Sequence, residues 1–294
     1  MKSTLPPELR AAIWMIGSIL SFSFMAVAGR WLSSEYDTFE IMLYRSITGV
    51  IVVFIAAQMF GTLHQVTRAS APQQILRNVF HFAGQNLWFF ALTIIPLAQV
   101  FALEFTSPIW VLVLSPIFLG ERLTRPRVIA ALLGFIGILI VTRPGATPIN
   151  MGIIAAALSA ICFALTGMLT KRLTRNETLT CIMVYLTVTQ AIFGLICAGY
   201  DGDIALPTLT SAPLLALVGL AGLIAHVCLT KALSIAPATV VIPIDFTRLP
   251  MIAIIGYLIF GEALDVWVFA GAALIFAGNY YNIWSETRKA QVSG

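Results

Sequence analysis

Ten long apolar stretches make up most of this chain, and they constrain its fold more than any other feature. Crossing the hydrocarbon core of a membrane, about 30 Å thick, takes roughly 20 mostly apolar residues. Because unpaired backbone groups in lipid cost several kcal/mol each, these stretches are expected to be helices. The sequence therefore predicts an all-α integral membrane protein with ten transmembrane helices. The expected spans are Ala11–Ala28, Phe39–Phe60, Ile75–Ile94, Leu97–Leu119, Val128–Val141, Met151–Leu169, Thr178–Ala198, Ala212–Leu233, Pro237–Phe260 and Val266–Trp284.

The composition excludes most other classes of protein. Hydrophobic residues make up 59% of the chain and charged residues 10%, whereas soluble domains are about 45–50% apolar and about 25% charged. A soluble enzyme or a nucleic-acid-binding protein is therefore not expected. The cysteines and histidines lack the spacing of metal ligands, so the sequence predicts no metal and no cofactor. Enzyme motifs such as H-E-x-x-H or G-x-S-x-G are missing from the sequence as well.

The distribution of basic residues predicts the orientation in the membrane. Ten crossings place both termini on one side, and that side collects thirteen of the seventeen Lys and Arg residues. Cytoplasmic segments of membrane proteins are enriched in Lys and Arg. We therefore expect both termini to be cytoplasmic.

An internal repeat divides the chain into two five-helix units, residues 1–144 and 145–294. Because each unit has an odd number of helices, the second enters the membrane from the opposite side, which gives inverted repeats. Secondary transporters have this architecture and bind their substrate between the repeats. The matching residues stand 141 positions apart: Pro96 and Pro237, Glu104-Phe105-Thr106 and Asp245-Phe246-Thr247, and Gly120-Glu121 and Gly261-Glu262.

The run from Phe105 to Thr124, which ends in Leu-Gly-Glu-Arg-Leu-Thr, resembles the bacterial EamA-type transporters of the drug/metabolite transporter superfamily. Residues 258–264 repeat part of this element, but Ala263 and Asp265 stand where the first copy has Arg122 and Thr124. The resemblance implies ten helices, a cell (inner) membrane location and the export or uptake of small metabolites. Members of the family carry amino acids, cofactors, nucleotide derivatives or drugs.

Ionisable residues inside spans are functional candidates, because insertion of each costs at least about 2.5–3.5 kcal/mol at the membrane centre. Glu104 and Arg45 lie at similar depths in the fourth and second spans, so we expect them to form an ion pair. This pair would either fix the helix register or contact substrate or protons. Asp245 and Arg248 share a helix face between Pro243 and Pro250, and this stretch is the strongest site candidate.

A polar stripe follows one face of the third span. Arg77, His81, Gln85 and Trp88 recur at helical spacing. The stripe is expected to line an aqueous cavity; the alternative is burial by hydrogen-bonded neighbours. The repeat relates Gln85 to His226, just as it relates Glu104 to Asp245.

Deep aromatic side chains complete the predicted binding site, either by stacking on a substrate or by packing in the core. The aromatic candidates are Trp88, Phe89, Phe101, Phe105, Trp110, Tyr44 and Tyr185. In contrast, Glu121 and Glu262 follow a glycine at the end of a span, where they are expected to hydrogen-bond the turn into the next helix. The predicted substrate-binding residues are Arg45, His81, Gln85, Trp88, Phe101, Glu104, Tyr185, His226, Asp245 and Arg248.

This set of residues predicts a secondary transporter that works by alternating access as a monomer or homodimer. Its two charge signs suit a zwitterion and its aromatic residues suit an apolar group. Export of hydrophobic or aromatic amino acids is the function that the sequence favours. An uptake carrier for a cofactor, a nucleotide derivative or a drug-like compound is the alternative, ahead of an intramembrane enzyme or a scaffold.

Overall fold

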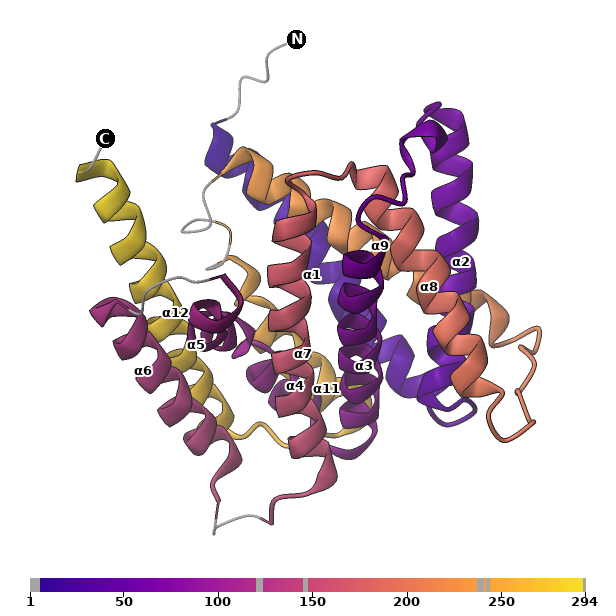
Figure 1. The fold of residues 1–294 in the computed structure, drawn as a ribbon. Helices are drawn as coiled ribbons and strands as arrows, with labels where there is room; N and C mark the ends of the chain where they lie inside the picture. The colour runs from indigo at the N-terminus through magenta and orange to yellow at the C-terminus, as the bar shows by residue number, and fades with distance from the viewer. Residues whose placement is uncertain (1–5, 120–123, 145–147, 237–240, 242–243, 293–294) are drawn as a thin grey trace.

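The computed structural model describes residues 6–119, 124–144, 148–236, 241 and 244–292. The regular elements in this part of the chain are α-helices and one short 3-10 helix (Figure 1). The first unit contains α1 (Pro7–Leu32), α2 (Thr38–Met59), η1 (Leu63–Gln65), α3 (Ala71–Ile94), α4 (Leu97–Glu104), α5 (Ser107–Leu119) and α6 (Arg125–Thr142). The second contains α7 (Met151–Leu173), α8 (Leu179–Ala198), α9 (Ala212–Ile235), α11 (Arg248–Phe260) and α12 (Val266–Val292).

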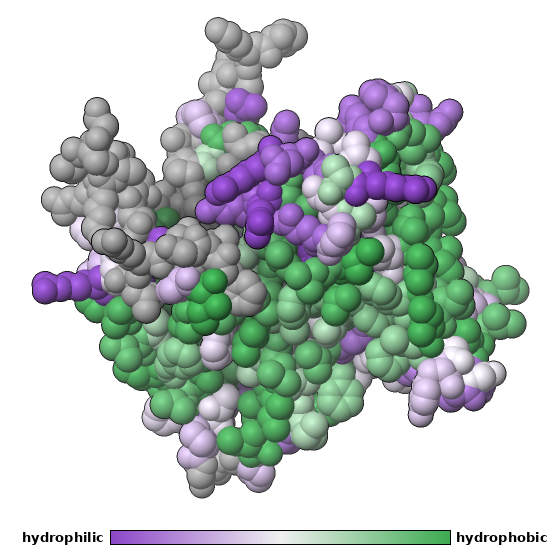
Figure 2. Space-filling view, viewed as in Figure 1, coloured by the Kyte–Doolittle hydropathy of each residue, from purple (hydrophilic) through white to green (hydrophobic). Residues whose placement is uncertain are grey.

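Eight helical segments of the described chain are long and apolar enough to cross a membrane, with α4 and α5 together counted as one. The two remaining expected spans contain α3, which is as long but carries the polar stripe, and α11, which has 13 residues. Figure 2 shows that apolar side chains cover a broad band of the molecule. Helix α1 begins and α12 ends at the same end of the bundle (Figure 1), as an even number of crossings requires.

The packing of the helices follows the internal repeat. The sixth and twelfth helices, α6 and α12, pack along each other, and so do α2 and α8. Each of these pairs joins equivalent helices of the two units. The pair α1 and α9 and the pair α3 and α7 exchange first and third helices. A two-fold axis that relates the units produces this pattern, so the predicted duplication is confirmed.

Close helix contacts depend on glycine. A Cβ atom on Gly137 of α6 would lie 2.8 Å from the Gly271 carbonyl oxygen of α12, and one on Gly271 would lie 2.6 Å from the Gly137 oxygen. Larger residues there would force the two backbones apart. Such small-residue contacts are the usual means of helix association in membranes.

The fourth helix of each unit is broken at the same position, although the sequence predicts an interruption only in the second unit, between Pro243 and Pro250. Helix α4 ends at Glu104 and α5 begins at Ser107, so the span expected at Leu97–Leu119 is two helices. In the second unit a turn at Phe246 and Thr247 precedes α11. At both breaks a threonine hydroxyl donates a hydrogen bond to the backbone carbonyl three residues earlier. Thr106 Oγ1 donates to the Leu103 carbonyl at 2.6 Å, and Thr247 Oγ1 donates to the Ile244 carbonyl at 2.7 Å.

Pro250, the third residue of α11, fits the interruption expected between the two prolines. It lacks the backbone donor that would bond the carbonyl of Phe246, four residues earlier, and the turn lies at Phe246 and Thr247. Pro243 lies outside the described residues. The short linker at Ile95 and Pro96 lies between the third and fourth spans as their predicted bounds require, and α3 packs mainly along α7.

Candidate functional site

The strongest site candidate is a buried ion cluster around Arg248, whose side chain is only 4% exposed. Its Nη2 atom lies 3.1 Å from Glu104 Oε1 and 3.4 Å from Asp245 Oδ2. The second Glu104 oxygen accepts a hydrogen bond from Trp88 Nε1 at 2.9 Å. Among the residues that the structure describes, Asp245 Oδ1 and Arg248 Nε have no hydrogen-bond partner. We call Trp88, Glu104, Asp245 and Arg248 the Arg248 cluster.

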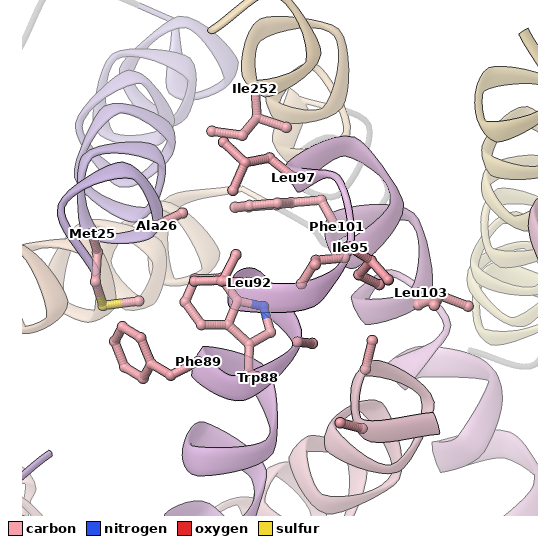
Figure 3. Close-up of a cluster of buried hydrophobic side chains, with 14 of the residues drawn as sticks. Met25, Ala26, Trp88, Phe89, Leu92, Ile95, Leu97, Phe101, Leu103 and Ile252 are labelled. Carbon is pink, nitrogen blue, oxygen red and sulfur yellow. The ribbon is translucent and has the colours of Figure 1, made fainter. Parts of the chain in front are cut away.

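Three phenylalanine rings surround the Arg248 guanidinium. Its central carbon lies 4.9 Å from the centroids of Phe22 and Phe101 and 5.0 Å from that of Phe105. Phe105 stacks on Phe246, its equivalent in the other unit, at 4.4 Å. Figure 3 shows Trp88 and Phe101 among buried apolar side chains. The cluster therefore lies where the two repeats meet, among aromatic side chains of both units.

The broken helices place these charges in the cluster. Glu104 is the last residue of α4 and Arg248 is the first residue of α11. A carboxylate is stabilised at a helix N-terminus and a cation at a C-terminus, by about 0.3–1 kcal/mol in ordinary surface settings. Both residues stand at the unfavourable end of their helix. Their position stabilises neither helix and instead brings opposite charges from the two repeats together.

The expected ion pair between Glu104 and Arg45 is wrong. Arg45 Nη1 donates to the side-chain oxygen of Gln85 and to the sulfur of Met42, and Glu104 pairs with Arg248. Helix α2, which carries Arg45, packs on α8 and α9, whereas α4 packs on α7 and α11. The two residues share a depth in the membrane, but depth does not determine which side of the bundle a residue faces.

Arg45 instead lines a small cavity of about 30 Å³ between α2, α3, α8 and α9. We call it the Arg45 cavity. His81 and His226 lie in its wall with their ring centroids 6.2 Å apart. Its lining residues are Met42, Arg45, Ser46, Gly49, His81, Leu186, Thr187, Gln190, Gly219, Gly222, Leu223 and His226.

The residues of the polar stripe on α3 lie in three different environments. Arg77 is buried by neutral partners, since Nε donates to Thr170 Oγ1 at 3.0 Å and Nη1 to Asn78 Oδ1 at 2.8 Å. His81 lines the Arg45 cavity, and Trp88 belongs to the Arg248 cluster. Of the four stripe residues, His81 lines a cavity, whereas Arg77 fits the alternative of burial by hydrogen-bonded neighbours.

Some aromatic candidates lie elsewhere. Among the described residues the Tyr185 hydroxyl has no hydrogen-bond partner, and its backbone carbonyl accepts from Asn78 Nδ2 at 3.1 Å and from Thr189 Oγ1 at 2.6 Å. The Tyr44 hydroxyl donates to the Ala205 carbonyl at 2.8 Å, and Trp110 packs edge-on against Phe135. The structure places none of these three side chains in the cluster or the cavity wall.

Sequence reasoning missed two residues that shape the site. Phe22 separates the cluster from the cavity, because its ring faces Arg248 at 4.9 Å and contacts His226 edge-on at 5.4 Å. Gly222 makes room for the Arg45 side chain, since a Cβ atom there would lie 2.9 Å from Nη2. Neither residue is ionisable. The only sequence signal for Phe22 was its match to Phe163 in the repeat.

The second Gly-Glu element connects helices and does not hydrogen-bond the turn into the next helix. Glu262 forms an ion pair with Arg30 of α1, and its other oxygen accepts from the Leu97 backbone nitrogen at 2.9 Å. Arg30 also donates to the Ile95 carbonyl at 3.1 Å. A Cβ on Gly256 would lie 2.3 Å from Glu262 Oε2, so a larger residue there would displace this carboxylate. Glu121, the equivalent of Glu262, lies outside the described residues.

Comparison with known proteins agrees with this architecture. The EamA-like transporter family matches residues 9–143 and 150–284, two segments offset by the same 141 residues as the internal repeat. An S-adenosylmethionine uptake transporter of Rickettsia conorii is 28% identical over 98% of this chain and 97% of its own length. A riboflavin transporter of Rhizobium johnstonii is 29% identical over 95% of this chain and 92% of its own length.

Solved structures share the fold as well. One crystal structure covers 95% of this chain and 98% of its own, with a TM-score of 0.66 at 17% sequence identity. The family match covers most of the chain in two copies, as the resemblance read from the sequence implied. The protein therefore belongs to the EamA-like transporter family.

Proposed function

We propose that this protein is a secondary transporter of a small metabolite that carries an amino-acid group and an aromatic ring. Membership of a transporter family makes it a membrane-embedded carrier of small molecules and not an enzyme. The observation that supports the substrate class is the Arg248 cluster, in which two carboxylates and one guanidinium lie among phenylalanine rings.

The charge balance of the cluster favours a cationic group on the substrate. When both carboxylates are ionised, Arg248 neutralises only one of them. Asp245 Oδ1 has no hydrogen-bond partner within the described ranges and offers an acceptor to a donor group of the substrate. Phenylalanine faces attract cations and stack with aromatic rings. An ammonium or sulfonium group beside an aromatic ring satisfies all of these features.

S-adenosylmethionine is the first candidate, because it combines an amino-acid group, a sulfonium cation and an adenine ring. The relative from Rickettsia conorii is named for its uptake. Aromatic amino acids, whose export the sequence favours, carry the same amino-acid group and a ring but no second cation. They are the second candidate. Riboflavin, for which another relative is named, has an aromatic ring system and no cation, so it fits the cluster less well.

Alternating access is the mechanism that the symmetry supports. Each unit contributes one carboxylate to Arg248, from Glu104 in the first and Asp245 in the second. Rocking of one unit against the other exchanges the end at which the cluster is accessible. A substrate biases this equilibrium only if it contacts the two states differently. Asp245, which is held loosely, is the residue suited to contact the substrate differently in the two states. We further propose that the membrane is the cell (inner) membrane and that both termini are cytoplasmic.

Flux measurements in proteoliposomes test the proposal. The purified protein should show saturable transport of labelled S-adenosylmethionine or of an aromatic amino acid, with trans-stimulation, in both directions and with or without a pH gradient. Asp203→Asn, which changes an exposed loop carboxylate, is the control variant and should leave the flux unchanged. Transport of riboflavin with no flux of either candidate would contradict the proposed substrate class.

A further inference from the structure

Within the described part of the chain, no carboxylate pairs with Arg45, a cation inside a membrane span. The hydrogen-bond partners of its side chain among the described residues are the neutral groups of Gln85 and Met42. The ion pairs of the described residues involve other arginines, namely Arg30, Arg143 and Arg248. Removing a charge from water without pairing it is costly. A retained unpaired cation in such a place indicates that its counter-ion arrives from outside the chain.

The surroundings of Arg45 carry further positive or donor groups. Arg77 lies one helical turn from His81 on α3, and its own partners are neutral. Among the described residues, His81 Nδ1 is buried without a hydrogen-bond partner, and an imidazole nitrogen that carries a proton donates to an anion. The titratable residues in the cavity wall are Arg45, His81 and His226. An anion therefore meets donors in this cavity and no competing carboxylate from its lining.

The size of the cavity limits which anion can enter. A volume of about 30 Å³ is enough for a few waters or one small planar group, because a single water needs about 10–15 Å³ on the same measure. The glycines at 219 and 222 let α9 approach α2 and leave room for the guanidinium. A carboxylate matches the planar, forked donor geometry of arginine.

Phe22 lies between this cavity and the Arg248 cluster. The centroid of its ring is 4.9 Å from the central guanidinium carbon of Arg248 and 5.4 Å from the centroid of the His226 ring. On α3, Gln85 contacts Arg45 and Trp88 contacts Glu104, three residues further along. A bound metabolite that reaches from the cavity past Phe22 thus meets groups of opposite charge preference at its two ends.

We propose that the Arg45 cavity binds the carboxylate of the transported metabolite, with Arg45 as its main ligand. The rest of the metabolite extends along Phe22 toward the Arg248 cluster. This inference rests on the proposed function for the identity of the metabolite. The anion site itself depends only on Arg45 and the cavity.

A first experiment tests the anion site without any substrate. The melting temperature of the detergent-purified protein is measured in sodium acetate and in sodium chloride at equal ionic strength. We expect acetate to raise the melting temperature of the wild-type protein and to have no effect on that of Arg45→Met. In chloride, Arg45→Met should melt no lower than wild type, because it removes an unpaired charge. Arg175→Met, which removes an exposed loop charge, is the control and should keep the acetate effect.

An equal acetate effect in wild type and Arg45→Met, or none in either, would overturn the anion site. A large loss of melting temperature in Arg45→Met would assign Arg45 a structural role and would overturn it as well. Gly222→Ala supplies a second variant, because its Cβ displaces the guanidinium without removing charge. It should also abolish the acetate effect.

A second experiment tests which molecule supplies the carboxylate. Binding of S-adenosylmethionine is compared with that of its decarboxylated analogue, and binding of tryptophan with that of tryptamine. In wild type we expect the ligand with the carboxylate to bind roughly 10- to 100-fold more tightly than its analogue without it, from the strength of a charge-assisted hydrogen bond. In Arg45→Met the two ligands of each pair should bind equally. Equal wild-type affinity within a pair that binds would overturn the inference. Binding of neither pair, together with a positive acetate result, would contradict the proposed substrates and leave the anion site standing.

Discussion

Two carboxylates contact the same arginine, yet their partners differ enough to separate their roles. Glu104 is held by Arg248 and by Trp88 Nε1, whereas Asp245 has only the 3.4 Å contact to Arg248 and one unpartnered oxygen. We therefore expect Asp245→Asn to lower flux at least about tenfold, with little change in melting temperature. Glu104→Gln should instead destabilise the fold by about 1–3 kcal/mol, because it weakens two buried hydrogen bonds.

Paired measurements of flux and thermal unfolding on the same purified variants check this difference. The expectation fails if Asp245→Asn transports normally, or if it melts as far below wild type as Glu104→Gln does. Residue types and depths were enough to select Glu104, Asp245 and Arg248 from the sequence. The partner of Arg45 was not predictable, because hydropathy gives no information on the direction a side chain faces around the helix axis.

At the level of helices, two glycines with different surroundings give a matched comparison. Gly271→Ala places a Cβ atom 2.6 Å from the Gly137 carbonyl oxygen, so α6 and α12 must separate. Gly167 lies within α7 with nothing within 4 Å of its Cβ position. Alanine favours a helix by about 1 kcal/mol over glycine. We expect thermal unfolding to show a lower melting temperature for Gly271→Ala and an equal or higher one for Gly167→Ala. Destabilisation of both to a similar extent would contradict the close contact.

The positions of the helices followed from hydropathy, because a span of lipid demands a run of apolar residues. The shortest expected span, Val128–Val141, lies within α6 at Arg125–Thr142, extended by residues that the apolar criterion had excluded. The break after Glu104 was not predicted. It depends on threonine hydroxyls that compete for backbone carbonyls, and threonine is also common inside unbroken helices.

For the whole molecule, the inverted repeat makes a prediction about sidedness. A cysteine at Arg175 or Asn176, in the loop before α8, should react with a membrane-impermeant reagent from the cytoplasm. A cysteine at Asp203, in the loop after α8, should react from outside. All three positions are exposed. Labelling of intact cells and of inverted vesicles measures this, and reaction of Asp203→Cys only from the cytoplasmic side would contradict the orientation.

The duplication was visible in the sequence because the paired Pro, acid and Gly-Glu positions survive at a constant offset. The asymmetry between the copies was visible too, but its meaning was not. Position 248 in the second unit corresponds to Ser107 in the first, so only one arginine serves both acids. A site shared by two repeats needs only one such cation, and only the folded arrangement shows this sharing.

The ion pair between Arg30 and Glu262 holds the two repeats together at the end of the bundle opposite the termini. Glu262 bonds both Arg30 of α1 and the Leu97 backbone nitrogen of α4. The side chain of Arg30 is only 18% exposed and that of Glu262 only 12%. Opening that end requires both contacts to break. Glu262→Ala should therefore populate the state that is open there and speed the labelling of Ala102→Cys, a fully buried position on α4, by an impermeant reagent added outside.

Asp265→Asn provides the matched control for this last experiment. Its ion pair with Arg143 lies at the same end, but the two side chains are 32% and 30% exposed, and pairs so open to solvent contribute about 0–1 kcal/mol. We expect labelling of Ala102→Cys to accelerate several-fold with Glu262→Ala and hardly at all with Asp265→Asn. Equal acceleration by the two variants would mean that loss of any charge at this end loosens it, and the Glu262 contacts would then have no specific part in closing the transporter.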